Sequence, residues 1–246
     1  MIRKTIAFTL AETLIVMGII GVVSALTLPN LNSSTGEKEK VAKVKKIYQN
    51  LDDALGRAQA VYGPIDEWFS SDDDLSGQVT KFSERITEFM KLSKTCGLAD
   101  NQGCFTKGSA KHLKGTSSYK NLDEGGSLKY YKFVTADGTS IAIVRTNYVP
   151  GGLAMVFYVD IDGSSKGQYT YGKDIFSFEI FYKDSMLTPM RASNFSQYLS
   201  NLKQDGTGTY ASGWVIDYDN MDYLKLNSEG KCPNGITPTE QNPRCK

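Results

Sequence analysis

Residues that could perform chemistry are few in this chain of 246 residues. His112 is the single histidine, so a His-based zinc site or a Ser-His-Asp triad would depend on that one residue. It lies in a polar, lysine-rich stretch, and no motif places a nucleophile beside a base. The sequence therefore predicts that the protein is not an enzyme.

The four cysteines form two close pairs along the chain. Cys96 and Cys104 flank a short glycine-containing loop, and Cys232 and Cys245 flank a Pro/Gly-rich C-terminal segment. In an oxidising compartment four cysteines allow three pairings, of which Cys96–Cys104 with Cys232–Cys245 is the simplest because each bond closes a local loop. A zinc site is the alternative, but neither pair has the two-residue spacing of a zinc knuckle.

Acidic residues gather in a glycine-rich turn between two expected strands. Asp160, Asp162 and Asp174 supply oxygen ligands that could hold calcium. An EF-hand is excluded, since Tyr171 stands at the twelfth position from Asp160, where a bidentate Glu is needed. A plain hairpin with Asx turns is the alternative. Calcium is thus the one candidate cofactor, and the sequence establishes none.

The N-terminus differs from the rest of the chain. Residues 14–31 carry no charge and would span roughly 27 Å as a helix, close to the ~30 Å apolar thickness of a bilayer. With Arg3 and Lys4 before it, this segment predicts a single membrane pass with a cytoplasmic N-terminus and an extracytoplasmic remainder. The alternatives are a plain anchor and a secretory signal cleaved after Ala25.

Glu12 is explained by neither alternative, because an ionisable group near an apolar span costs on the order of 2.5–3.5 kcal/mol. The run Ala7-Phe8-Thr9-Leu10-Ala11-Glu12, behind a basic leader, resembles the processing segment of type IV pilins and type II secretion pseudopilins. This resemblance implies cleavage by a prepilin peptidase between Ala7 and Phe8, methylation of the Phe8 amine, and an assembly role for Glu12. Family members mostly have Gly where this chain has Ala7.

The resemblance also implies helix-loosening roles for Gly21 and Pro29. Gly21 weakens a helix because glycine is a poorer helix former than alanine, and Pro29 because proline removes an intrahelical hydrogen bond. Ordinary helix packing and a plain kink are the alternatives for these positions. The new Phe8 amine of one subunit could pair with Glu12 of its neighbour in an apolar helical bundle. Such a head-to-tail contact does not close, so it generates a filament.

The elements that must position these residues follow from periodicity. A one-sided apolar stripe predicts an amphipathic helix over about 37–62, with its lysine-rich opposite face in solvent. Residues 32–36 are a break or a weak point, at which the helix either restarts or continues. A second helix is expected over 76–94 and a short one over 194–202. Strands are expected at 129–135, 140–146, 153–160, 176–182 and 213–217.

The predicted fold class is therefore α+β and pilin-like. It has a long N-terminal helix, transmembrane in its first half and amphipathic in its second, packed on an antiparallel sheet. The parts are a cleaved leader (1–7), a transmembrane and filament-core helix (8–31) and an extracytoplasmic globular domain (32–246).

Charge gives no indication of a nucleic-acid partner. The chain has 28 Lys+Arg against 27 Asp+Glu, a net charge of +1. Loss of residues 1–7 would remove Arg3 and Lys4 and leave 26 basic against 27 acidic side chains.

The sequence predicts a structural subunit of a pseudopilus or type IV pilus. The subunit would start in the bacterial inner membrane and move into a periplasmic or cell-surface filament. Its partners would be the prepilin peptidase, other pilin-like subunits and an assembly platform. The alternative is a membrane-tethered or secreted binding protein that enters no filament.

Overall fold

The computed structural model describes residues 10–70, 73–118, 120–124, 129–149, 152–164, 169–181 and 184–245, without the side chains of 24–35, 147–149 and 152–154. Ala7 and Phe8 lie outside the described residues. The chain divides into two compact units, Met1–Glu39 and Lys40–Lys246.

The longest element is the helix α1, Leu10–Tyr62. It passes without interruption through 32–36, where the sequence left open whether the helix restarts or continues. The polar residues of that stretch are only modestly poorer helix formers than alanine, so a helix that already extends on both sides continues through them. Pro29 also stands inside α1.

The predicted transmembrane first half of this helix is not supported. Among the helices in the described ranges, none combines the length and the apolar character needed to cross a membrane. The predictions of a fold with a transmembrane helix and of a single-pass inner-membrane location are therefore wrong.

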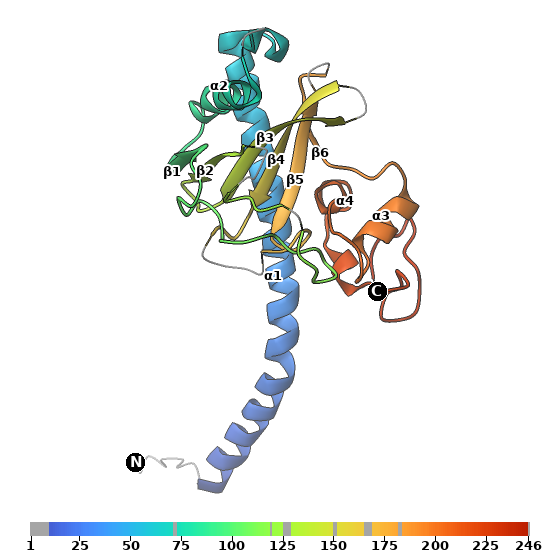
Figure 1. Ribbon diagram of the computed structural model, residues 1–246. Helices are drawn as coiled ribbons and strands as arrows, with labels where there is room; N and C mark the ends of the chain where they lie inside the picture. Colours follow the sequence, from blue (N-terminus) through green and yellow to red (C-terminus); the bar gives the residue numbers. More distant parts are fainter. Residues whose placement is uncertain are drawn as a thin grey trace, which may run out of the picture. The chain divides into compact units, whose positions relative to one another are not determined.

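Six antiparallel strands form one sheet in the unit Lys40–Lys246, in the order β1-β2-β3-β4-β5-β6 (Figure 1). They are β1 Leu92–Gly97, β2 Tyr131–Thr135, β3 Ser140–Val149, β4 Gly152–Asp160, β5 Ile175–Phe181 and β6 Leu187–Pro189. Each strand pairs with its sequence neighbour because short turns join most of them. Between β2 and β3, for example, Gly138 adopts φ +88°, which a glycine tolerates without strain.

The main core lies on one face of this sheet. The α1 residues Val44, Leu51 and Leu55 are almost fully buried there, and Tyr48 stacks on Phe178 of β5 at 5.6 Å between ring centroids. The helix α2, Leu75–Thr87, covers the same face beside α1. The opposite face is covered by the segments that follow β1 and β4, through a second cluster rich in tyrosine. Both faces are thus buried.

The predicted helix over 76–94 is shorter than expected. The helix α2 ends at Thr87, and the edge strand β1, which the sequence did not predict, begins at Leu92. Two one-turn 3-10 helices, Ile65–Trp68 and Asp222–Lys225, follow α1 and the helix that ends at Tyr218.

The predicted strand at 213–217 is wrong, because those residues belong to the helix α4, Ala211–Tyr218. Five consecutive α4 residues are buried, from Ala211 to Val215, so the segment has no alternating pattern to separate helix from strand. The helix α3, Phe195–Leu202, forms where a short helix was expected and is capped by the Asn194 side chain, which accepts from Gln197 N–H.

Both disulfides join the pairs that were simplest on sequence grounds, Cys96–Cys104 and Cys232–Cys245. Cys96 belongs to the edge strand β1 and Cys104 to the segment over the second face of the sheet, so this bond fixes one to the other. Two disulfides are compatible with an extracytoplasmic protein.

Gly213 of α4 tests the packing in this region. A Cβ at this position would lie 2.9 Å from the carbonyl oxygen of Met190 and would also collide with Tyr198. Gly213→Ala should therefore destabilise the fold by about 1–3 kcal/mol, although alanine favours helices.

Gly56 of α1 is the matched control, because beyond its chain neighbours and the adjacent helix backbone no atom lies within 4 Å of an added Cβ. Gly56→Ala should stabilise the fold by about 1 kcal/mol. Denaturant unfolding of both variants measures the difference, and equal shifts of the same sign would contradict the packing described here.

Candidate functional site

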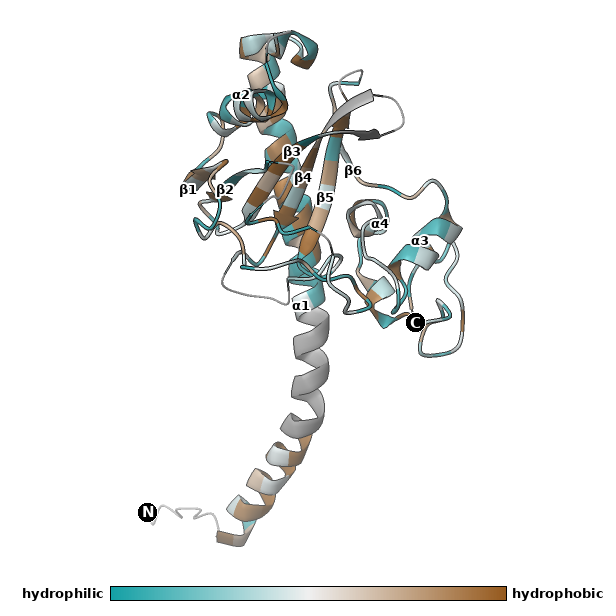
Figure 2. Ribbon diagram, in the orientation of Figure 1, coloured by the Kyte–Doolittle hydropathy of each residue, from teal (hydrophilic) through white to brown (hydrophobic). Residues whose placement is uncertain are grey.

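The first described turns of α1 are apolar apart from Glu12 and Thr13. Leu14, Ile15, Val16 and Met17 occupy four consecutive positions, and each is at least 51% exposed. In Figure 2 the described N-terminal part of α1 is coloured mostly brown, as hydrophobic. Glu12 stands in the first turn of the same helix. A helix that is apolar all round is normally buried against other helices or lipid. These turns therefore expose a surface that requires a partner.

The residues expected to loosen this helix fall within it. Gly21 lies on α1, and apart from its chain neighbours and the adjacent helix backbone no atom lies within 4 Å of an added Cβ. No close contact therefore requires a glycine there. Pro29 also lies on α1, and its side chain is not described.

The structure brings the three predicted calcium ligands to the same end of the sheet. Asp160 ends β4, Asp162 follows in the turn, and Asp174 directly precedes β5. Lys40 of α1 reaches into this turn, with its Nζ 2.7 Å from Asp174 Oδ1 and 3.1 Å from Asp162 Oδ2. Lys43, one turn further along α1, places its Nζ 3.3 Å from Asp162 Oδ1.

The cation in this turn is therefore an ammonium group. In the described ranges no group of three or more His, Cys, Asp or Glu side chains could hold a metal ion. Lys40 occupies the position between two of the carboxylates where the sequence analysis placed calcium. The calcium site expected at Asp160, Asp162 and Asp174 therefore stays a prediction, which this arrangement of the described residues does not support.

Electrostatics in this turn differ from one carboxylate to the next. Burial lowers the pKa of Lys40, but the hydrogen bonds and charges of Asp174 and Asp162 outweigh it and raise that pKa. Burial opposes the effect of Lys40 and Lys43 on Asp162, yet the two ammonium groups lower the pKa of Asp162.

Asp160 behaves in the opposite way. Its side chain is fully buried, and its Oδ2 has no hydrogen-bond partner among the described residues. Burial, with a contribution from the charges of Asp174 and Asp162, raises the pKa of Asp160 to about 7.

Two more lysines of α1 pair with acidic residues of the same unit. Lys46 Nζ lies 2.8 Å from Asp137 Oδ2 in the β2–β3 turn, and Lys45 Nζ lies 2.6 Å from Asp219 Oδ1 after α4. Burial raises the pKa of Asp137, but the hydrogen bonds from Lys46 and Thr135 outweigh it and lower this pKa to about 2. Sequence reasoning placed these lysines on a solvated face. A spacing of three residues, which places side chains on one side of a helix, links Lys46 to Lys40 and Lys43, whereas no such spacing marks Lys45.

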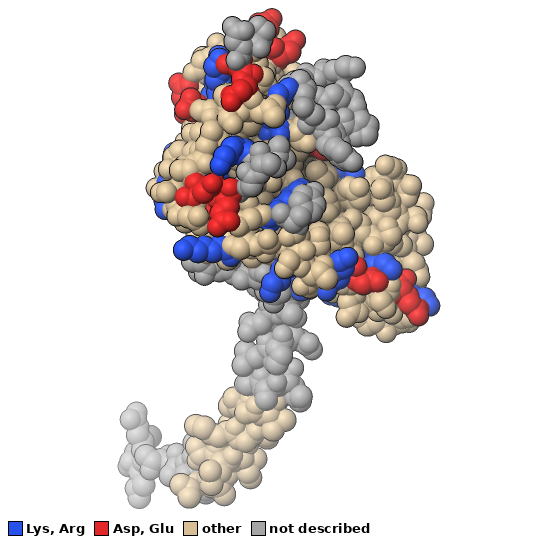
Figure 3. Space-filling view, in the orientation of Figure 1, with Lys and Arg blue, Asp and Glu red and all other residues tan. Residues whose placement is uncertain are grey.

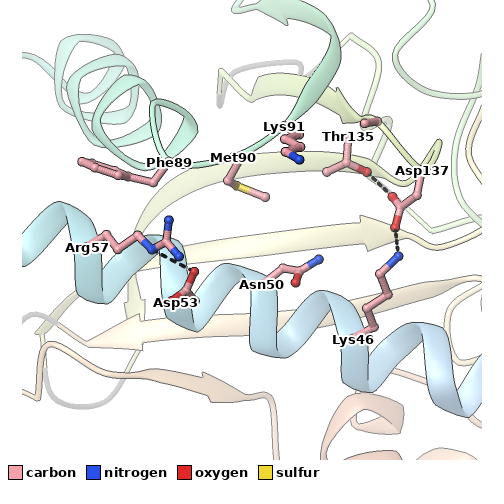
Figure 4. A pocket seen from close by; sticks show the side chains of 10 residues that line it. Lys46, Asn50, Asp53, Arg57, Phe89, Met90, Lys91, Thr135 and Asp137 are labelled. Carbon is pink, nitrogen blue, oxygen red and sulfur yellow. Dashed lines mark hydrogen bonds and ion pairs between the residues drawn. The ribbon is translucent and has the colours of Figure 1, made fainter.

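A pocket of about 320 Å³ lies beside the Lys46–Asp137 pair, between α1, the segment before β1 and the β2–β3 turn (Figure 4). Arg57 also lines it but is engaged by Asp53, with 3.1 Å between Nε and Oδ2. Because Lys46 and Arg57 each have a carboxylate partner already, this pocket offers little unneutralised charge to a ligand. On the face seen in Figure 3, basic and acidic side chains are interspersed.

Asp160→Asn should change how stability depends on pH. The folded protein binds the Asp160 proton more tightly than the unfolded chain, whose aspartate titrates near 3.8, so this stabilisation is complete below about pH 4 and lost as pH rises to about 7. Asp160→Asn should thus be more stable than the wild type at pH 8, by up to about 4 kcal/mol, with the difference gone at pH 4.

Denaturant unfolding at both pH values measures this difference. Asp162→Asn is the control of opposite sign, because the lowered pKa of Asp162 stabilises the fold above its unfolded pKa. A stability difference between Asp160→Asn and wild type that did not vary with pH would contradict the assignment.

Lys40→Gln should destabilise the fold by about 2 kcal/mol, because it leaves the carboxylates of Asp162 and Asp174 together without their cation. Lys38→Gln is the matched control, an exposed lysine half a turn earlier on α1. Thermal or denaturant unfolding compares the two. Similar small losses in both variants would show that the Lys40 contacts add nothing to stability.

Comparison with known proteins does not assign the chain to a family. No family model matches it, and no curated protein or solved structure is significantly similar to it. A proposal of function therefore depends on the residues and contacts described above.

Proposed function

We propose that this chain is a structural, non-catalytic subunit of a pilus-like filament, either a type II secretion pseudopilus or a type IV pilus. It would assemble through the N-terminal part of α1 after its leader is removed and its new N-terminus methylated. The processing segment from Ala7 to Glu12 supports this proposal through its resemblance to the pilin family.

The observation that carries the proposal is the exposure of the apolar turns of α1. Leu10 is 81% exposed and Leu14 66%, on a helix without a polar face in this region. Fully burying one such side chain contributes about 1.5–3 kcal/mol, so the surface strongly favours association. Equivalent helices of neighbouring subunits would bury it on all sides, as a filament core requires.

Glu12 supplies the specificity that apolar contact lacks. In an apolar bundle its carboxylate is costly unless a cation lies beside it, and cleavage after Ala7 would create one at the Phe8 amine. Pairing between the amine of one subunit and Glu12 of the next would set the axial step. The same contact would repeat from subunit to subunit and build a helical assembly.

The disulfides suit a filament head in an oxidising compartment. Each closes a short loop, with sequence separations of 8 and 13 residues, and restricts the unfolded chain. The partners of the proposal are a prepilin peptidase, other pilin-like subunits and an assembly platform.

Glu12→Ala should abolish incorporation into filaments while cleavage and folding of the head remain unchanged. The expected loss is at least about tenfold, because an unpaired charge in an apolar bundle costs more than 1.4 kcal/mol. Immunoblots of sheared filaments and of whole cells measure it. Glu39→Gln, which removes an exposed carboxylate further along α1, is the control and should assemble normally. Wild-type filament yield from Glu12→Ala would refute the pairing.

Mass spectrometry of the mature protein tests the processing independently. The proposal requires a chain that begins at a methylated Phe8. A chain that begins at Met1 would contradict it, and one that begins at Leu26 would favour a conventionally secreted binding protein.

A further inference from the structure

The N-terminus of α2 faces a pocket that holds a buried cation. This pocket of about 270 Å³ is lined by Asp74, Leu75, Ser76, Val79, Lys129, Val144 and Arg145. Its two basic residues come from β3 and from the segment before β2. Because β2 pairs Tyr131 with Ile143, the same alternation brings Lys129 beside Arg145.

Arg145 is the unusual member of this set. Its side chain is only 9% exposed, and its Nε is buried with no hydrogen-bond partner among the described residues. Among the described residues, Arg145 also forms no ion pair. A guanidinium in this position loses hydration without gaining a counter-charge, which is costly unless an anion joins it.

The other groups at the pocket are compatible with an anion. The N–H groups of Leu75 and Ser76 belong to the first turn of α2 and have no acceptor within the helix. Asp74 is the one acid in the lining, and its Oδ1 accepts from Gly77 N–H at 2.6 Å, so its charge is directed at the helix cap. Lys129 is 45% exposed and shares Asp100 with Lys132.

We propose that this pocket binds one oxyanion, a carboxylate or a phosphate group, between Arg145, Lys129 and the first turn of α2. A guanidinium offers two parallel N–H donors that match either group. The α2 amides would complete the set of donors, as helix N-termini do for phosphate and carboxylate ligands. The inference stands independently of the proposed filament function.

The test is a titration of the full chain, kept in solution by a nonionic detergent, with inorganic phosphate and separately with acetate at constant ionic strength. Saturable shifts of the Leu75 and Ser76 amide signals in NMR spectra are expected. Saturation by phosphate at lower concentration would assign a phosphate ligand, and comparable saturation by acetate would assign a carboxylate.

Arg145→Gln should weaken binding about tenfold or more, and Arg145→Lys by less, because lysine keeps the charge but not the two parallel donors. Lys107→Gln, an exposed lysine outside the pocket lining, should bind as the wild type does. Lys129→Gln, expected to weaken binding about threefold, gives the answer if Arg145→Gln fails to fold. Absence of saturable shifts with both anions, or equal affinity in wild type and the folded variants, would overturn the proposal.

Discussion

Burial of one stripe of α1 against the sheet is the contact on which the head depends. Val44, Leu51 and Leu55 each contribute about 1.5–3 kcal/mol by leaving water, and the strands they cover would otherwise expose an apolar face. Tyr48 shows how closely the two surfaces fit, since its ring stacks on Phe178 while its hydroxyl donates to the Leu187 carbonyl. Every other element of the unit Lys40–Lys246 is arranged around this helix and sheet.

Charges decide where along the sheet the helix sits. An apolar stripe can slide by one turn at modest cost, because similar side chains recur every three or four residues. Lys40 cannot slide, since its ammonium group lies between two carboxylates that are fixed at the ends of β4 and β5. The Lys46–Asp137 pair repeats the constraint at the β2–β3 turn. Electrostatics thus add specificity to a contact whose stability is mainly hydrophobic.

Local patterns in the sequence predicted the parts of the fold that depend on local interactions. The stripe on α1 and the hairpin at Gly138 follow from periodicity and turn chemistry, and the disulfides from the short spacing of each cysteine pair. The segment around Trp214 could not be read this way. Its residues are buried on several sides by α3 and the last strands, so the period that separates helix from strand is absent.

The lysine that pairs with the acidic turn could not be predicted from the sequence for a different reason. Asp160, Asp162 and Asp174 are recognisable in the sequence, but Lys40 stands more than a hundred residues earlier and meets them only through the fold. A lysine on the polar side of a helix has no local feature that separates a solvated group from a paired one. The acidic cluster could therefore be recognised in the sequence, while its lysine partner required the tertiary structure.

The N-terminal and C-terminal stretches of α1 differ in how their apolar side chains are distributed around the helix. From Lys40 onward the helix has one apolar side and one polar side, and the head satisfies both within a single chain. From Leu10 to Val23 it is apolar apart from Glu12 and Thr13, and no element of its own unit covers it in the described residues. A surface that is apolar all round cannot be covered by one flat partner. It requires several neighbours, and equivalent helices supply them most simply, which is the physical reason to favour assembly over a monomeric binding protein.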